Sequence, residues 1–134
     1  MKEPVWVDLP DCLAFHEELL SRFGGLSGIR DERLLDSALN RPHHAFAYGK
    51  PTLFRLAAAY AFGISRNHPF LDGNKRMAFL IAALFLEING FHVAASEEEV
   101  VVQTVALAAN DITEADYALW LRHSSTKKRR TPLS

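Results

Sequence analysis

Apolar residues recur every three or four positions through most of the chain, and this spacing predicts an all-α protein. Asp11 is predicted to cap a first helix whose apolar positions end at Gly24 and Gly25, a pair typical of a helix end. A second helix is predicted to begin at Asp31 and to end at Pro42, because proline has no amide hydrogen to donate within a helix.

The helical pattern becomes stronger in the second half of the chain. A helix predicted over residues 52–64 ends ahead of Pro69, because the residue before a proline avoids helical geometry. The next helix, over residues 73–89, is apolar nearly all round, so we expect it to be the central helix. Two closing helices, over residues 97–109 and 114–123, each start with the spacing of a capping box.

One segment lacks the helical stripe. Residues 43–50 alternate between polar and apolar, and Gly49 followed by Pro51 marks a turn, so a short β-hairpin is predicted there. Elsewhere the sequence has no run of alternating strands that would build a larger sheet. The pattern therefore predicts a compact helical bundle around a central helix, with one short β-hairpin as a flap near His68.

Composition narrows the class of protein. A chain of 134 residues, of which 49% are hydrophobic, fits one folded domain, which we place at residues 1–125. The formal net charge of −1 argues against direct binding of nucleic acid, because such binding draws mainly on neutralised phosphates. The basic run from Lys127 to Arg130 is interpreted as part of a flexible C-terminal tail over residues 126–134.

Two further features bear on location. The single cysteine, Cys12, excludes an internal disulfide and fits a reducing compartment, and the N-terminus has no basic-then-apolar export signal. The apolar run over residues 77–86 is too short and too closely flanked by charges to span a bilayer. We therefore expect a cytoplasmic protein with no membrane partner.

A polar loop between two apolar helices, residues 67–76, concentrates the residues that carry chemistry. The free amides at a helix start bind anions. Gly73 lets the backbone turn inward, so that amides near Asn74 and Lys75 can form a concave nest. A phosphate chain is the occupant that this arrangement predicts.

The side chains of the loop complete a set suited to phosphoryl transfer. Asp72 can hold Mg²⁺ with one carboxylate while nucleotide phosphates and waters fill the other positions. Lys75 and Arg76 can neutralise charge on the transferred group. His68 is a suitable base for an attacking hydroxyl, because histidine titrates near neutral pH. Taken singly, each residue fits an ordinary charged loop at a helix start. Taken together within residues 68–76, they favour a phosphate site.

The loop resembles the motif of the Fic/Doc family, HxFx[DE]GN followed by glycine or lysine and then arginine. The motif is filled by His68, Phe70, Asp72, Gly73, Asn74, Lys75 and Arg76. The upstream sequence Gly28-Ile-Arg-Asp31, with Leu34-Leu35, Ser37-Ala38-Leu39 and Arg41-Pro42, is similar to the signature of the Doc branch. The resemblance covers about residues 5–122, so the domain at 1–125 is identified as a Fido domain.

The resemblance implies a role for each motif residue. His68 corresponds to the family's base, Asp72 to its Mg²⁺ ligand, and Gly73 and Asn74 to the turn that binds nucleotide phosphates. Arg66 matches a nucleotide-contacting arginine of the Doc branch, and its alternative interpretation is a surface arginine at a helix end.

The residue after Asn74 separates two chemistries in this family. Most members have glycine there and transfer AMP, whereas Doc-like proteins have lysine and transfer the γ-phosphate of ATP. Lys75 therefore implies phosphorylation, although Gly73 is a departure, because Doc has alanine at that position. The resemblance thus implies an ATP-dependent protein phosphotransferase, with a Fic-type AMP transferase as the alternative.

The resemblance also implies partners. The inhibitory motif [ST]xxxE[GN] of many Fic enzymes is absent, so inhibition is expected from a separate protein. This arrangement is typical of a type II toxin-antitoxin system, in which a cognate antitoxin folds a disordered inhibitory segment as a helix into a groove beside the active site. The implied substrate is a hydroxyl of a host translation protein, elongation factor Tu. A third hypothesis is a non-catalytic module that acts through its antitoxin.

Overall fold

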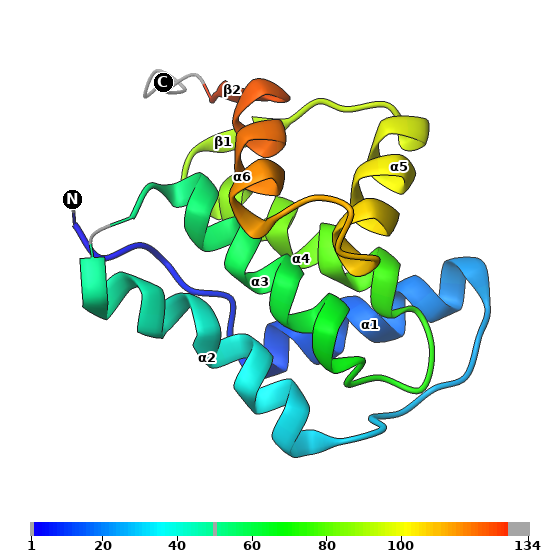
Figure 1. Cartoon of the computed structure of the whole chain (residues 1–134). Coiled ribbons are helices and arrows are strands. Elements are labelled where there is room, and N and C mark those ends of the chain that lie inside the picture. The colour runs from blue at the N-terminus through cyan, green and yellow to red at the C-terminus, as the bar shows by residue number, and fades with distance from the viewer. Residues whose placement is uncertain (1, 50, 129–134) are drawn as a thin grey trace, which may run out of the picture.

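The computed structural model describes residues 2–49 and 51–128 and shows a helical protein (Figure 1). Its elements in chain order are α1 (Leu9–Phe23), α2 (Glu32–Gly49), α3 (Leu53–Asn67), α4 (Asn74–Ile88), β1 (Phe91–Val93), α5 (Glu97–Ala108), α6 (Glu114–His123) and β2 (Ser125–Lys127). α3 and α4 pack side by side, α2 and α6 pack on α3, and α1 and α5 pack on α4. The predicted all-α bundle with a small β element is confirmed.

Helix starts follow local capping chemistry. The capping boxes predicted ahead of the two closing helices are present at the starts of α5 and α6. α1 begins earlier than predicted, because Asp8 and not Asp11 is its N-cap. The Asp8 carboxylate accepts a hydrogen bond from the Asp11 amide at 3.1 Å. Pro10 stands in the first turn, where a missing amide hydrogen has no cost.

The predictions of a helix end at Pro42 and of a β-hairpin flap over residues 43–50 are wrong. α2 continues through Pro42 as far as Gly49. The proline removes one hydrogen bond from the helix, but its ring is buried with the apolar face of α2 against α3. The next residue, His43, stacks on Trp6 with ring centroids 3.9 Å apart. Tertiary packing thus outweighs the local tendency to stop.

The predicted central helix, α4, shares the centre of the bundle with α3, which is the more enclosed of the two. Small side chains on α3, including Ala57, Ala58 and Ala61, let neighbouring helices pack close to it on several sides. α4 keeps a partly exposed apolar face that includes Phe79, Leu80 and Leu84. None of the helices in the described ranges is long and apolar enough to cross a membrane.

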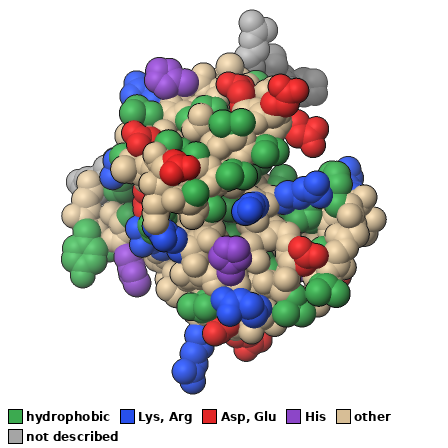
Figure 2. Space-filling model, turned by 45° about the vertical axis from the view of Figure 1, so that its right-hand side comes forward, with side chains coloured by type: hydrophobic (Ala, Val, Ile, Leu, Met, Phe, Trp, Pro, Cys, Tyr) green, Lys and Arg blue, Asp and Glu red, His purple; other side chains and the backbone are tan. Residues whose placement is uncertain are grey.

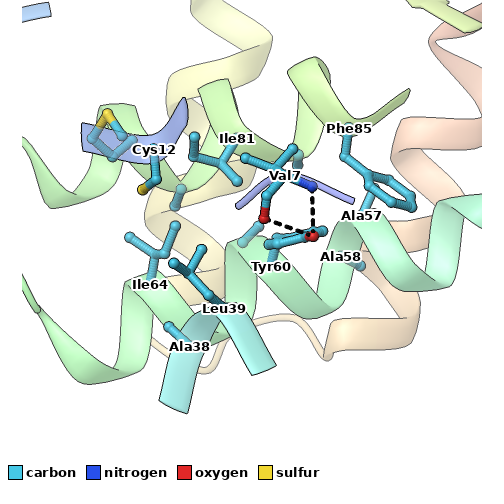
Figure 3. Close-up of a cluster of buried hydrophobic side chains, with 14 of the residues drawn as sticks. Val7, Cys12, Ala38, Leu39, Ala57, Ala58, Tyr60, Ile64, Ile81 and Phe85 are labelled. Atoms are coloured by element: carbon cyan, nitrogen blue, oxygen red, sulfur yellow. Dashed lines mark hydrogen bonds between the residues drawn. The ribbon is translucent and has the colours of Figure 1, made fainter. Parts of the chain in front are cut away.

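The segment before α1 is held against the core by Tyr60 (Figure 3). The buried Tyr60 hydroxyl accepts a hydrogen bond from the Val7 amide at 3.0 Å and donates one to the Val7 carbonyl at 3.2 Å. Cys12 is buried in the same cluster, near Ile64 and Ile81. These contacts fix α1, whose inner face supports the polar loop.

The β element of this fold lies near the C-terminus. β1 and β2 pair antiparallel, with Phe91 opposite Lys127, His92 opposite Thr126 and Val93 opposite Ser125. Two residues of the predicted flexible tail, 126 and 127, therefore belong to the fold, because they satisfy the backbone of β1. The remainder of that predicted tail from residue 129 lies outside the described residues.

Burial makes Cys12 a test of the core. Desolvation, with a smaller contribution from the negative charge of Asp11, raises the pKa of the Cys12 thiol from 9.0 to about 12. The thiolate is the reactive form, so the native protein at about pH 8 should react with a disulfide-exchange reagent at least about 100-fold more slowly than the protein unfolded in denaturant. Stopped-flow absorbance measures both rates. Equal rates would contradict the packing of α1.

Candidate active site

The loop between α3 and α4 begins with a strained histidine. His68 is the C-cap of α3 and has φ 45° and ψ 56°, a left-handed conformation that residues other than glycine seldom adopt. Its backbone is held by Arg30, whose Nε donates to the His68 carbonyl at 2.6 Å and whose Nη2 donates to the Asn67 carbonyl at 2.7 Å. A cation at a helix C-terminus is also favoured by the helix dipole.

A backbone clamp joins this loop to the segment Gly28–Asp31. The amides of Arg30 and Asp31 donate to the Pro69 carbonyl at 2.7 and 3.1 Å, and the Leu71 amide donates to the Gly28 carbonyl at 3.1 Å. Gly28 has φ 116°, which a residue with a side chain rarely adopts. The upstream signature seen in the sequence therefore serves to hold the loop.

The inner side of the loop is anchored in the core. Phe70 is 1% exposed and stacks on His16, with ring centroids 4.0 Å apart. The Asn74 side chain accepts from the Phe70 amide at 3.0 Å and donates to the Phe70 carbonyl at 2.9 Å. The side chain of Asn74 is thus engaged within the protein, and any contact that this residue makes with a phosphate comes from its backbone amide.

Asp72 is positioned by two backbone amides and by the side chain of His16. Its carboxylate accepts hydrogen bonds from the Gly73 amide at 2.9 Å and from the Leu26 amide at 3.2 Å. Its carbonyl accepts a hydrogen bond from His16 Nε2 at 2.9 Å, which requires the proton on that nitrogen. A side chain at Gly25, where φ is 121°, would place its Cβ 2.8 Å from the Asp72 carboxylate. Gly25 thus leaves the room that this carboxylate occupies.

The loop residues line one cavity of about 530 Å³. Its walls come from the end of α1 and from the loop, and include His68, Asp72, Gly73, Asn74, Lys75 and Arg76. Lys75 is exposed, and the Arg76 guanidinium lies 4.1 Å from the centre of the Phe23 ring at the edge of the cavity. The face of the molecule in Figure 2 shows Lys and Arg side chains spread around a histidine near its middle.

The start of α4 lines this cavity with groups that are suited to binding an anion. Gly73 is the N-cap of α4, with φ 79° and no side chain to accept from the first amides of the helix. The first amides of a helix have no partner within it. They therefore face the cavity as donors, at the positive end of the helix dipole and beside two cationic side chains.

A divalent cation fits this donor set in one way. Asp72 is the only acidic residue among those that line the cavity, and no group of three or more potential ligands occurs in the described ranges. A site that is built wholly from protein ligands is therefore not supported. Mg²⁺ is usually held by one or two carboxylates together with phosphate oxygens and waters, and Asp72 is suited to that mode.

One predicted residue is not with the others. Arg66 lines a different cavity, between α2, α3 and α6, and not the cavity of the loop. The structure thus brings together His68, Asp72, Gly73, Asn74, Lys75 and Arg76, and Arg66 lines a separate cavity.

Three residues that support the site were not recognised in the sequence. Arg30 lies within the family signature without a predicted role, His16 has no predicted role, and Gly25 is predicted only as part of a helix end. The position of His16 carried a signal: it lies four residues after Cys12 on the buried stripe of α1 and is 2% exposed. A polar residue on a buried stripe usually has a hydrogen-bond partner.

The backbone clamp leads to a test of Arg30. Arg30→Ala removes two hydrogen bonds to backbone carbonyls, so it should lower the free energy of unfolding by about 1–3 kcal/mol and release His68 from its strained conformation. The matched control is Arg33→Ala, because the side chain of Arg33 makes no hydrogen bond or ion pair within the described ranges. Urea unfolding and the NMR signals of the His68 ring measure the two effects. Identical behaviour of both variants would contradict the assigned role.

Comparisons with known proteins agree with this geometry. A model described as Fic/DOC family matches residues 6–86. Protein kinase doc of Escherichia phage P1 is 36% identical over 113 residues, which cover 84% of this chain and 89% of that protein. Toxin Doc of Mycolicibacterium smegmatis is 47% identical over 76 residues, which cover 54% of this chain and 58% of that protein. With the loop motif filled and its residues gathered in one cavity, these matches show that the chain belongs to the Fic/DOC family, in its Doc branch.

Proposed function

We propose that this protein is a toxin that transfers the γ-phosphate of ATP to a hydroxyl of a host protein. The observation that carries the proposal is the uncapped start of α4, which faces the same cavity as His68, Asp72 and Lys75. The names of two relatives, Protein kinase doc and Toxin Doc, support both the reaction and the biological role. The proposed cofactors are ATP and Mg²⁺.

In the proposed mechanism, phosphates of ATP bind to the free amides of α4. Asp72 would hold Mg²⁺, which shields phosphate charge and orients the transferred group when bound. Lys75 and Arg76 neutralise negative charge on the phosphoryl oxygens. Both residues line the cavity, and the backbone amides at the start of α4 are already oriented by the helix.

His68 has the remaining task, which is to take the proton from the attacking hydroxyl. As that proton moves to the imidazole, the hydroxyl oxygen bonds to the γ-phosphorus and the bond from phosphorus to the bridging oxygen breaks, so that ADP leaves. The ring of His68 makes no hydrogen bond to any residue in the described ranges, and it lines the cavity. Its strained, clamped backbone limits the directions in which the ring can point.

An AMP transferase is the second candidate, and Gly73 is the observation that favours it. A Cβ at Gly73 would lie 3.2 Å from Leu19. Alanine, which Doc has at this position, would therefore narrow the cavity. Glycine leaves that wall open. The two reactions differ in which phosphorus of ATP stays on the substrate.

The position of the label on ATP separates these reactions. We expect the wild-type protein, incubated with a bacterial lysate and ATP that is labelled at the γ-phosphorus, to transfer the label to a protein of the lysate. The proposed substrate is elongation factor Tu. His68→Ala should lower the rate at least about 100-fold, because it removes the base. Lys75→Gly should lose most γ-transfer and gain weak labelling from α-labelled ATP, because the change opens the nest and deletes a charge. Labelling by the wild type from the α-position alone would establish AMP transfer instead.

The toxin role requires an inhibitor, and the exposed apolar face of α4 offers a place for it. A groove of about 310 Å³ lies between α1, α4 and α5, and a second of about 290 Å³ continues along α4. Both grooves are lined by Phe79 and Leu80. The first also shares Leu19, Phe23 and Arg76 with the cavity of the loop. We propose that the inhibitory segment of the cognate antitoxin binds here as an amphipathic helix.

Two neighbouring valines on α5 provide a matched test of this groove. Val101 lines the groove and is 56% exposed, whereas Val102 is 63% exposed and lines none of the cavities described here. Val101→Asp places a carboxylate against the antitoxin helix and should weaken binding at least about tenfold, because that charge must lose water without a partner. Calorimetry and growth rescue on co-expression measure the loss. Equal effects of Val101→Asp and Val102→Asp would remove the groove from consideration.

A further inference from the structure

The cavity that contains Arg66 has no part in the proposed transfer. It has a volume of about 460 Å³ and lies between α2, α3 and the start of α6, and we call it the α2–α3 pocket. Six residues of α2 line it: Ser37, Asn40, Arg41, His44, Ala45 and Tyr48. The α2 members recur every three or four residues, so they form one face of that helix.

The floor of the pocket depends on a close approach of two helices. A Cβ built on Gly63 would lie 2.9 Å from the Cα of Ala38, so only glycine permits α2 and α3 to pack at this distance. Phe62 lies beside this contact, and two guanidinium groups lie over its ring. The Arg41 group is 4.3 Å and the Arg66 group 5.2 Å from the ring centre. Guanidinium groups over an aromatic face are held in place without losing their charge.

The two arginines differ in their electrostatic state. Glu114 neutralises Arg41, because its Oε1 accepts from Arg41 Nε at 3.1 Å and from Nη2 at 2.6 Å. The side chain of Arg66 is exposed and makes no hydrogen bond or ion pair with any residue in the described ranges. The pocket therefore holds one uncompensated positive charge, with the neutral hydrogen-bonding groups of Asn40 and Ser37 on the facing wall. This set matches a single carboxylate.

The position of the pocket suggests where that carboxylate comes from. Asn67 lines the α2–α3 pocket and His68 lines the cavity of the loop. The Cα atoms of two consecutive residues are about 3.8 Å apart, so the two cavities flank the same stretch of backbone. Because this stretch of backbone borders both cavities, a protein substrate that presents a hydroxyl to His68 is also within reach of the α2–α3 pocket.

We propose that the α2–α3 pocket binds an acidic side chain of the protein substrate, located beside the acceptor hydroxyl, and that Arg66 is its recognition residue. This inference rests on the proposed function. It assigns Arg66 to the substrate and not to the nucleotide, because the free helix amides that suit a phosphate chain lie in the other cavity. The exposed Tyr48 lines the pocket at the C-terminal end of the α2 face.

The test is steady-state kinetics with ATP and the protein that the wild type labels in the lysate, purified. Arg66→Glu should raise KM for the protein substrate at least about tenfold, because it places a carboxylate against a carboxylate. KM for ATP should stay within about twofold of the wild-type value. Arg55→Glu is the matched control: it makes the same charge change on an exposed residue of α3 that lines none of the cavities, and it should leave both constants unchanged. Thermal unfolding confirms that both variants fold.

A charge swap completes the test. Acidic residues that lie near the labelled hydroxyl on the substrate are changed one at a time to lysine, and one of them should restore the rate with Arg66→Glu while it slows the wild type. A change in KM for ATP alone would return Arg66 to the nucleotide and overturn the proposal, as would no change in either constant. If the wild type transfers neither label, the proposed function fails, and the substrate pocket fails with it. The kinetic outcomes distinguish the two failures.

Discussion

The backbone clamp between the segment Gly28–Asp31 and the residues Pro69–Leu71 is the interaction on which the site depends. Three amide-to-carbonyl hydrogen bonds join these segments. Without these hydrogen bonds, the six consecutive residues of the loop between α3 and α4 would sample many conformations. Ordering each of them for catalysis would then cost conformational entropy. With them, the polar side chains leave a fixed backbone toward one cavity, while Phe70 turns into the core.

A division between structural and chemical groups follows from this clamp. Hydrogen bonds within the protein already occupy the side chain of Asn74 and the carbonyl of Asp72. The groups that remain for the cavity are the first amides of α4, the imidazole of His68, the carboxylate of Asp72 and two cations. A residue of the family motif can therefore have the role of holding neighbouring residues in position. Asn74 does so, because its side chain closes the loop through Phe70.

The sequence predicted what depends on local order and missed what depends on distant contacts. The capping boxes at two helix starts and the helix start near Gly73 were predicted correctly, because their interactions lie within a few residues. The continuation of α2 past Pro42 could not be predicted, since it is the packing on α3 that stabilises it. Arg66 shares a helix end with the loop but lines a different cavity, and only the arrangement of α2 beside α3 shows this. His16 and Arg30 act on the loop across 56 and 38 positions of sequence.

The apolar groove along α4 shares three residues with the wall of the cavity of the loop. Release of an occupant from that groove would therefore expose the candidate active site and an apolar surface at the same time. Large exposed apolar patches promote self-association. A molecule released in this way would therefore either bind its target or associate with other copies of itself. The supply of inhibitor would then set how long the active protein molecules stay dispersed, as well as how many of them there are.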